Sequence, residues 1–244
     1  MYNAGGSSPT LGNCTFTSNS VEFNGGGMYN LDGSSPILDN CTFTSNSAGN
    51  GGGMHNFSSS SPTLTDCTFT SNSVTGLFSK GGGMYNEESS PILISCTFAI
   101  NSATGTYSGG GGMYNYKGSP TLADCTFTSN SAGDSGGGMS NEEGTPTLTD
   151  CNFCGNTTSG SGNRNVQGDI DASSSGNLLL ANCNPGDVNF DLAINRGDLF
   201  YVLGRWKATS VLNADINLDG VVNVGDLVFI LINFAGTTDD TPAD

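Results

Sequence analysis

One sequence frame recurs through most of the chain and limits what it can fold into. The frame is Leu-x-x-Cys-x-Phe-x-x-Asn, and a Gly-Gly-Gly-Met run precedes every copy after the first. Its cysteines, 26 to 29 residues apart, are Cys14, Cys41, Cys67, Cys96, Cys125 and Cys151. A period of this length indicates stacked supersecondary units, none of which can bury its apolar face alone.

Each repeat has the pattern of short strands joined by tight turns. Cys67 and Phe69 alternate with Thr68 and Thr70, which is the two-residue period of a strand. Three such runs, around GGGMHN, SPTLTD and CTFTSN, are bounded by turn-forming residues. Three strands and three corners make one rung, meaning one complete turn, of a parallel β-helix with rungs ~4.8 Å apart. We therefore expect an all-β parallel β-helix of about six to seven rungs over residues 1–183.

Stacked rungs place equivalent side chains above one another, so the interior should contain ladders of identical residues. The framed cysteines should form one ladder of reduced thiols, because their parallel Cβ vectors suit a disulfide poorly. A row of metal thiolates is the alternative, although no His or clustered Cys pair accompanies it. The leucine ladder is Leu11, Leu38, Leu64, Leu93, Leu122 and Leu148, and the phenylalanine ladder is Phe16, Phe43, Phe69, Phe98, Phe127 and Phe153.

The asparagine that ends each frame is expected at a corner. There its side chain tolerates left-handed backbone geometry, and stacked amides can form hydrogen bonds from rung to rung. These residues are Asn19, Asn46, Asn72, Asn101, Asn130 and Asn156.

Several features depart from the regular frame. Residues 73–80 and 102–109 are adjacent insertions at one corner, expected either as binding loops or as neutral solvated loops. The lone His55 is expected at a corner, facing solvent. Residues 178–183 repeat the Leu-x-x-Cys step through Leu180, which predicts a seventh, partial rung with Cys183 in the thiol ladder and Cys154 as an outward-facing odd thiol.

The first residues fall in the middle of a repeat. Met1 lies as far before Cys14 as Met28 lies before Cys41, but no glycines precede it. We expect an N-terminally incomplete fragment whose leader and earlier rungs are absent, and no signal peptide is recognisable.

Two spaced sets of oxygen ligands follow the repeats. They occupy positions 1, 3, 5, 7, 9 and 12 of a calcium loop, with a backbone carbonyl at position 7, and each precedes an apolar run of helical spacing. The second loop has Gly220 at position 6, whereas the first has Leu192, so the first should bind Ca²⁺ more weakly. The predicted ligands of the two ions are Asp187, Asn189, Asp191, Ala193, Asn195 and Asp198, then Asp215, Asn217, Asp219, Val221, Asn223 and Asp226.

Two families share these motifs. The Gly-Gly-Gly-Met and Phe-Thr-Ser-Asn repeats resemble those of polymorphic outer-membrane proteins and related right-handed parallel β-helix proteins, which implies a secreted or surface-displayed adhesive solenoid. Residues 184–236 resemble a type I dockerin, which implies a small α-helical domain with two calcium loops, followed by an acidic tail at residues 237–244. Arg196-Gly197 and Val224-Gly225 depart from the small hydroxyl pairs with which that family chooses a cohesin partner.

The net charge argues against some classes of binding partner, and the pattern of outward-facing residues suggests a binding surface. A net charge of −16 argues against nucleic acid and anionic membranes, and no apolar run is long enough to span a bilayer. Outward-facing threonines on the CTFT strands predict a flat array that could bind a glycan, ice or a mineral, although threonine also simply suits exposed strands. The array comprises Thr15, Thr17, Thr42, Thr44, Thr68, Thr70, Thr97, Thr126 and Thr128.

The favoured hypothesis is an extracellular, non-catalytic structural and adhesive protein. Its calcium module would mediate attachment to a cohesin-like or cell-surface protein, or self-assembly with other copies, end to end, into a filament. The alternative is a β-helix that binds or cleaves polysaccharide, as a lyase or hydrolase. We expect no catalytic activity, because the rungs contain only Lys80, Lys117 and Arg164 as cations and their acids lie mostly at corners.

Overall fold

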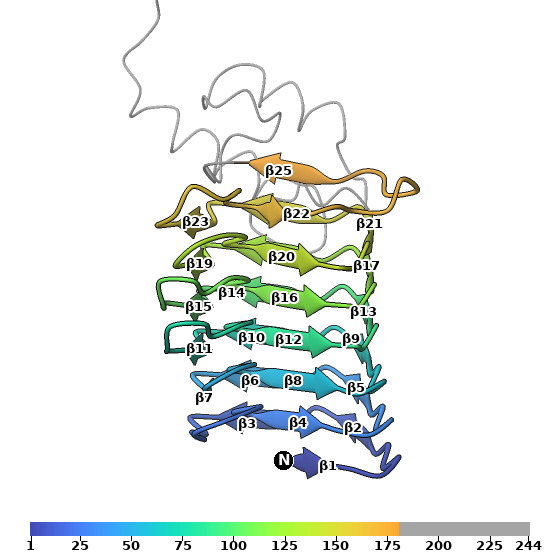
Figure 1. The fold of residues 1–244 in the computed structure, drawn as a ribbon. Coiled ribbons are helices and arrows are strands. Elements are labelled where there is room, and N and C mark those ends of the chain that lie inside the picture. The colour runs from blue at the N-terminus through green and yellow to red at the C-terminus, as the bar shows by residue number, and fades with distance from the viewer. Residues whose placement is uncertain (181–244) are drawn as a thin grey trace, which may run out of the picture. The chain divides into compact units, whose positions relative to one another are not determined.

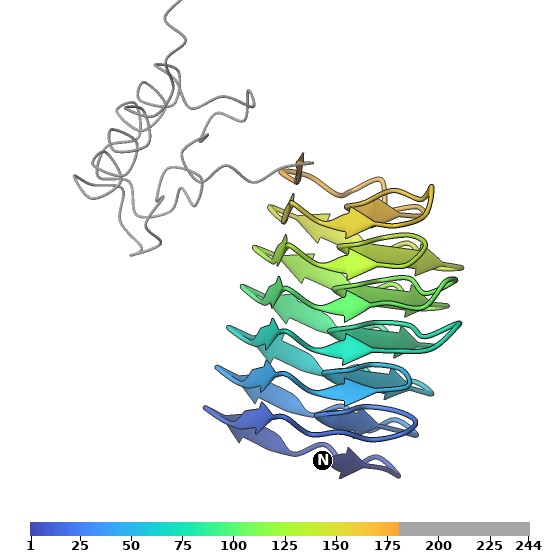
Figure 2. The same cartoon turned by 90° about the vertical axis from the view of Figure 1, so that its left-hand side faces the viewer.

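The repeats form a parallel β-helix, as the spacing predicts. The computed structural model describes residues 1–180, with side chains to residue 177. Figure 1 shows the rungs stacked in sequence order from the N-terminus, and Figure 2 shows strands of successive rungs directly above one another. All pairings between neighbouring rungs are parallel and in register; Phe69, for example, lies between Phe43 and Phe98. The predicted calcium module, residues 184–236, the tail and Cys183 lie outside the described residues.

Four parallel sheets run along the solenoid, whereas the sequence predicts three. The fourth consists of two-residue strands that are too short to show a periodic pattern, and we call it sheet D. Sheet A contains β1 (Tyr2–Asn3), β4 (Met28–Asn30), β8 (Met54–Phe57), β12 (Met84–Glu87), β16 (Met113–Tyr116), β20 (Met139–Glu142) and β24 (Val166–Gln167). Sheet B contains β2 (Thr10–Gly12), β5 (Ile37–Asp39), β9 (Thr63–Thr65), β13 (Ile92–Ile94), β17 (Thr121–Ala123) and β21 (Thr147–Thr149). Sheet C contains β3 (Thr15–Thr17), β6 (Thr42–Thr44), β10 (Thr68–Thr70), β14 (Thr97–Ala99), β18 (Thr126–Thr128), β22 (Asn152–Cys154) and β25 (Leu178–Leu180). Sheet D contains β7 (Ser47–Ala48), β11 (Ser73–Val74), β15 (Ser102–Ala103), β19 (Ser131–Ala132) and β23 (Thr157–Thr158).

The core consists of the predicted ladders and a methionine column from sheet A. Leu38 to Leu148 and Phe43 to Phe153 are fully buried, while Leu11 and Phe16 of the first rung pack against them. Successive phenylalanine rings are nearly parallel, with centroids 4.6 to 4.7 Å apart. A chain poor in bulky residues therefore still gains a continuous apolar column, because each ring stacks on the next at the rung spacing.

The framed cysteines are free and, except for half-buried Cys14, buried. Their thiols donate weak hydrogen bonds to backbone carbonyls, as Cys96 does to Ile94 at 3.4 Å. Burial raises the pKa of the Cys41 thiol, which disfavours the reactive thiolate. The prediction that the framed cysteines form an interior ladder without disulfides is confirmed.

The asparagine ladder is confirmed in its hydrogen bonding and wrong in its backbone geometry. Asn101 Nδ2 donates to Asn130 Oδ1 at 2.9 Å, and the same bond repeats between neighbouring rungs. The left-handed residue is the one before each asparagine, such as Ser71 (φ 56°) or Ile100 (φ 59°). The asparagine itself is free to point inward because its predecessor makes the turn.

Glycine is required where the chain enters sheet A. Gly81 has a φ of +68°, and a Cβ at Gly82 would lie 2.4 Å from the carbonyl oxygen of Gly111 in the next rung. Only residues without a side chain let adjacent rungs approach this closely. The Gly-Gly-Gly-Met run is thus a consequence of rung stacking.

The last described strand corrects the predicted seventh rung. β25 pairs with β22, so Leu179 lies opposite Phe153 and Leu180 opposite Cys154. Leu180 is therefore not in the leucine ladder, because the bridge between Ser175 and Thr149 places Ser174 at the position that follows Leu148. Three consecutive leucines carry no two-residue pattern, so the sequence did not fix their register.

Cys154 is not the exposed odd thiol expected from the sequence. It is buried and disulfide-bonded, and the other cysteines of the described residues are free.

Candidate binding surfaces

The predicted threonine array lies in register on the outer face of sheet C. Thr68 pairs with Thr42 and Thr97, while the intervening phenylalanines point inward. Thr15 and Thr17 are exposed and the other array members are half-buried. The second column is interrupted by Ala99 between Thr70 and Thr128. The structure thus brings the threonines together, and their binding role stays a prediction.

The predicted calcium ligands, residues 187–226, all lie outside the described residues. Within residues 1–180, no group of three His, Cys, Asp or Glu side chains is placed to hold a metal ion.

A column of aromatic side chains, which the sequence analysis missed, lies on the outer face of sheet A. Tyr29, His55, Tyr85 and Tyr114 follow the inward-facing methionines and form one column, with centroids 5.1, 4.6 and 5.6 Å apart; the first two pairs are stacked, and Tyr85 and Tyr114 meet edge to face. We call these four residues the tyrosine column. The signal was available, since the residue after each Gly-Gly-Gly-Met is Tyr or His in four successive rungs.

His55 lies inside this column, which corrects the expectation of a solvent-facing corner residue. The residue is 2% exposed, and its ring lies between the rings of Tyr29 and Tyr85. Its Nε2 lies 3.6 Å from Glu87 Oε2, and neither ring nitrogen has a hydrogen-bond partner. Burial lowers the pKa of His55, and Glu87 opposes that shift without overcoming it. His55 belongs to strand β8 of sheet A, which directly follows the glycine run, and therefore does not lie at a corner.

A second outward-facing column on sheet A alternates aromatic and acidic residues. Phe57, Glu87, Tyr116 and Glu142 pair directly from rung to rung at the last position of their strands, and we call them the mixed column. The first three are half-buried and Glu142 is exposed. Tyr114 of the tyrosine column donates its hydroxyl to Glu142 Oε2. The buried tyrosine column therefore supports the carboxylates of the mixed column.

Two lysines lie against these columns. Lys80 Nζ is 4.5 Å from the centroid of the Tyr114 ring, and it also donates to the carbonyl oxygen of Tyr107 at 3.1 Å. Lys117 Nζ is 4.8 Å from the Tyr116 ring and 3.9 Å from Glu143. The two distances from a lysine Nζ to a tyrosine ring are within the range of cation–π attraction. Ionisable and aromatic groups of separate rungs thus gather on this face.

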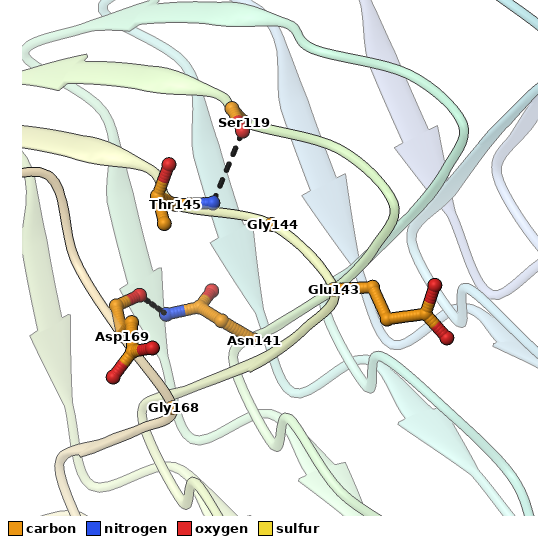
Figure 3. Close-up of a pocket in the computed structure, with 7 residues that line it drawn as sticks. All are labelled: Ser119, Asn141, Glu143, Gly144, Thr145, Gly168 and Asp169. Carbon is orange, nitrogen blue, oxygen red and sulfur yellow. Dashed lines mark hydrogen bonds between the residues drawn. The ribbon is translucent and has the colours of Figure 1, made fainter.

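A polar hollow of about 490 Å³ lies beside the C-terminal end of the mixed column. Its lining residues are Ser119, Asn141, Glu143, Gly144, Thr145, Gly168 and Asp169. Figure 3 shows two internal hydrogen bonds, from Asn141 Nδ2 to the carbonyl of Asp169 (3.3 Å) and from the amide of Thr145 to Ser119 Oγ (3.0 Å). The Glu143 carboxylate points away from Asn141 and Asp169 (Figure 3). Two pairs of lining groups are thus hydrogen-bonded to each other, and the Glu143 and Asp169 carboxylates do not converge on one point.

The two inserted loops stack on each other, as their adjacency in the repeat predicts. Phe78 and Tyr107 form a parallel pair with centroids 5.3 Å apart, and the Tyr107 amide donates to the carbonyl of Leu77 at 3.0 Å. Leu77, Phe78 and Tyr107 are each more than half exposed. These loops therefore form an apolar projection at one corner.

Comparison with known proteins gives one match. The family model described as right handed beta helix region matches residues 1–184. No curated protein and no solved structure matches the chain. In the part of the chain that the structure describes, no helix has the length and apolar character needed to cross a membrane.

Proposed function

The chain belongs to the right-handed β-helix family, and from that premise we propose that it is an extracellular, non-catalytic structural and adhesive protein. In this proposal the solenoid is a rigid spacer that presents repeated surfaces. The dockerin-like module of residues 184–236 binds two Ca²⁺ ions and attaches the chain to other copies or to a cohesin-like partner at a cell surface.

The observation that carries this proposal is the repetition of outward-facing side chains from rung to rung. Threonines, tyrosines and the mixed column each continue over several rungs in register. Such columns suit many weak contacts with a repetitive partner, whereas catalysis requires a few groups that converge on one point.

The disulfide at Cys154 supports the extracellular assignment. Disulfides persist in oxidising compartments and are rare in the cytosol. The buried cysteines of the ladder are free, which is compatible with an oxidising compartment because the parallel Cβ vectors of stacked residues suit a disulfide poorly.

Calcium titration of the full chain tests the attachment proposal. Isothermal titration should detect two ions, and sedimentation velocity should show larger assemblies with Ca²⁺ than with a chelator. Asp215→Ala should remove one ion and weaken assembly, while the exposed solenoid variant Asp39→Ala should behave like the unmodified chain. An unchanged monomer with and without Ca²⁺ at high concentration would refute calcium-driven assembly.

One observation favours a second candidate, polysaccharide hydrolysis. Glu87 and Glu142 lie on the same face two rungs apart, ~9.6 Å between backbones, which is close to the carboxylate separation of inverting glycosidases. The nearby His55 imidazole lowers the pKa of Glu87, so this carboxylate could serve only as the base. New reducing ends that disappear in Glu87→Gln would establish this activity.

A further inference from the structure

The chain contains four Asn-x-Ser/Thr motifs, and all of them lie in the solenoid. This motif is the acceptor of N-linked glycans and belongs on the surface of a secreted protein. The motifs begin at Asn13, Asn40, Asn56 and Asn156. The fold places the four asparagines in two different environments, which decides which of them can carry a sugar.

Two of the four asparagines have no room for a glycan in the folded protein. Asn56 and Asn156 are fully buried, and their side chains donate hydrogen bonds to neighbouring rungs. Asn56 Nδ2 donates to Asn86 Oδ1 at 2.8 Å, and Asn156 Nδ2 donates to the carbonyl oxygen of Phe127 at 2.9 Å. A sugar on either nitrogen would have to lie inside the solenoid, and protein interiors are close-packed.

The other two asparagines lie at the corner between sheets B and C, and both are exposed. Asn13 follows β2 and Asn40 follows β5, and each makes the turn into sheet C with a left-handed backbone, at φ values of 54° and 48°. Asn40 Nδ2 donates to Asn13 Oδ1 at 2.7 Å on this surface. A glycosylated amide keeps one N–H, so this hydrogen bond can persist beside a sugar.

The remaining residues of these two motifs are also accessible or unconstrained. Thr15 is exposed and Thr42 is half-buried, both on the outer face of sheet C. The intervening Cys14 and Cys41 are free, so no disulfide restrains either motif. The later rungs carry residues without an amide at this corner, namely Asp66, Ser95, Asp124 and Asp150. The corner between sheets B and C therefore offers acceptor amides only in the first two rungs of the solenoid.

We propose that the corner formed by Asn13 and Asn40 is an N-glycosylation site. The acceptor is the Nδ2 atom of either asparagine, and the donor is an oligosaccharide joined through pyrophosphate to a lipid. Transfer forms a bond between Nδ2 and the anomeric carbon of the first sugar and breaks the bond between that carbon and the pyrophosphate. One Nδ2 proton passes to a base of the transferase, and the lipid pyrophosphate leaves.

This inference rests on the extracellular location in the proposed function, which the Cys154 disulfide supports. The attached glycan would cover the corner between sheets B and C with a bulky, hydrophilic chain. It would also shield the edge of the threonine array in the first two rungs.

Secretion of the full chain from a eukaryotic host tests the inference, because such a host supplies both the donor and the transferase. Peptide-N-glycosidase in heavy-oxygen water converts each glycosylated asparagine to a labelled aspartate, which peptide mass spectrometry locates. Circular dichroism confirms that the analysed chain is folded. We expect the label at Asn13, Asn40 or both, and none at Asn56 or Asn156. Chain extracted from the secretory compartment is mapped in the same way, so the result does not depend on export.

Valine variants separate recognition of the motif from the packing of the solenoid. Thr15→Val combined with Thr42→Val removes both hydroxyls that the motif requires and keeps both asparagines, so all glycan should be lost. Thr17→Val combined with Thr44→Val is the matched control, because these threonines lie on the same strands, β3 and β6, and on the same outer face. The control should carry as much glycan as the unmodified chain.

The outcomes separate this inference from the proposed function. A folded chain without glycan, or with glycan only at Asn56 or Asn156, overturns the inference and leaves calcium-driven assembly standing. Equal loss of glycan in the control variant also overturns it. A chain that stays monomeric with Ca²⁺ refutes calcium-driven assembly but leaves the glycosylation site standing.

Discussion

Removal of one internal asparagine should destabilise the solenoid by an amount that its position in the stack determines. Asn101 takes part in four side-chain hydrogen bonds, all between buried groups. Its Oδ1 accepts from the amide and the Nδ2 of Asn72, at 3.0 Å each. Its Nδ2 donates to the carbonyl of Phe69 and to Asn130 Oδ1, at 2.9 Å each. At about 1 kcal/mol for each lost bond, Asn101→Ala should lower the free energy of unfolding by about 4 kcal/mol.

Two further asparagine variants show how the loss of unfolding free energy depends on the number of hydrogen bonds removed. Asn86, in sheet A, belongs to a second asparagine column and makes two bonds with its neighbours, at 2.8 Å each, so Asn86→Ala should cost about 2 kcal/mol. Asn19 belongs to the same ladder as Asn101 but lies exposed in the first rung. Its side chain makes one bond, to Asn46 Oδ1, so Asn19→Ala should cost at most about 1 kcal/mol.

Urea denaturation followed by circular dichroism measures these differences, provided that the three variants share one m-value. The predicted order of destabilisation is Asn101, then Asn86, then Asn19. Equal losses at Asn101 and Asn86 would refute the reasoning, because the two side chains are equally buried, the substitutions remove the same atoms, and Asn101 makes more hydrogen bonds.

Four further measurements follow from the structure. Ile100 is a β-branched residue at a φ of 59°, where other rungs carry serine or Gly155, so Ile100→Gly should raise the free energy of unfolding by about 1 kcal/mol, while Ile92→Thr should not. Gly82→Ala should lower it by about 2 kcal/mol because the new Cβ meets the Gly111 carbonyl, whereas Gly12→Ala, in open space, should be nearly neutral. His55 has a lowered pKa in the fold, so the unfolded chain binds more protons as pH falls below about 6.5, and the melting temperature should drop between pH 7.5 and 5.5. His55→Phe should reduce this dependence, since the chain contains no other histidine, and a slope as steep as that of the unmodified chain would contradict the prediction. Leu192→Gly should strengthen the weaker calcium site about fivefold by isothermal titration, and an unchanged affinity would show that position 6 is not strained.

The interior of the solenoid could be predicted from the sequence because stacked rungs require the same residue type at equivalent interior positions. A phenylalanine above Phe69 must match its shape, so Phe43 and Phe98 are identical residues and the ladder is visible in the sequence. The same reasoning places the leucines, the cysteines and the amide ladder.

Other features could not be predicted so directly. Outward positions need not match, so a histidine takes the place of a tyrosine in the tyrosine column and the column was missed. The strands of sheet D are two residues long and show no period. The second asparagine column, including Asn56 and Asn86, lies between more conspicuous residues of the Gly-Gly-Gly-Met strands. The predicted calcium ligands stay predictions.

A crystal structure of the full chain, grown with Ca²⁺, tests most directly whether equivalent side chains of successive rungs lie above one another. We expect parallel Phe43 and Phe69 rings about 4.6 Å apart inside the solenoid. Phenylalanines on different walls of the solenoid would contradict the account.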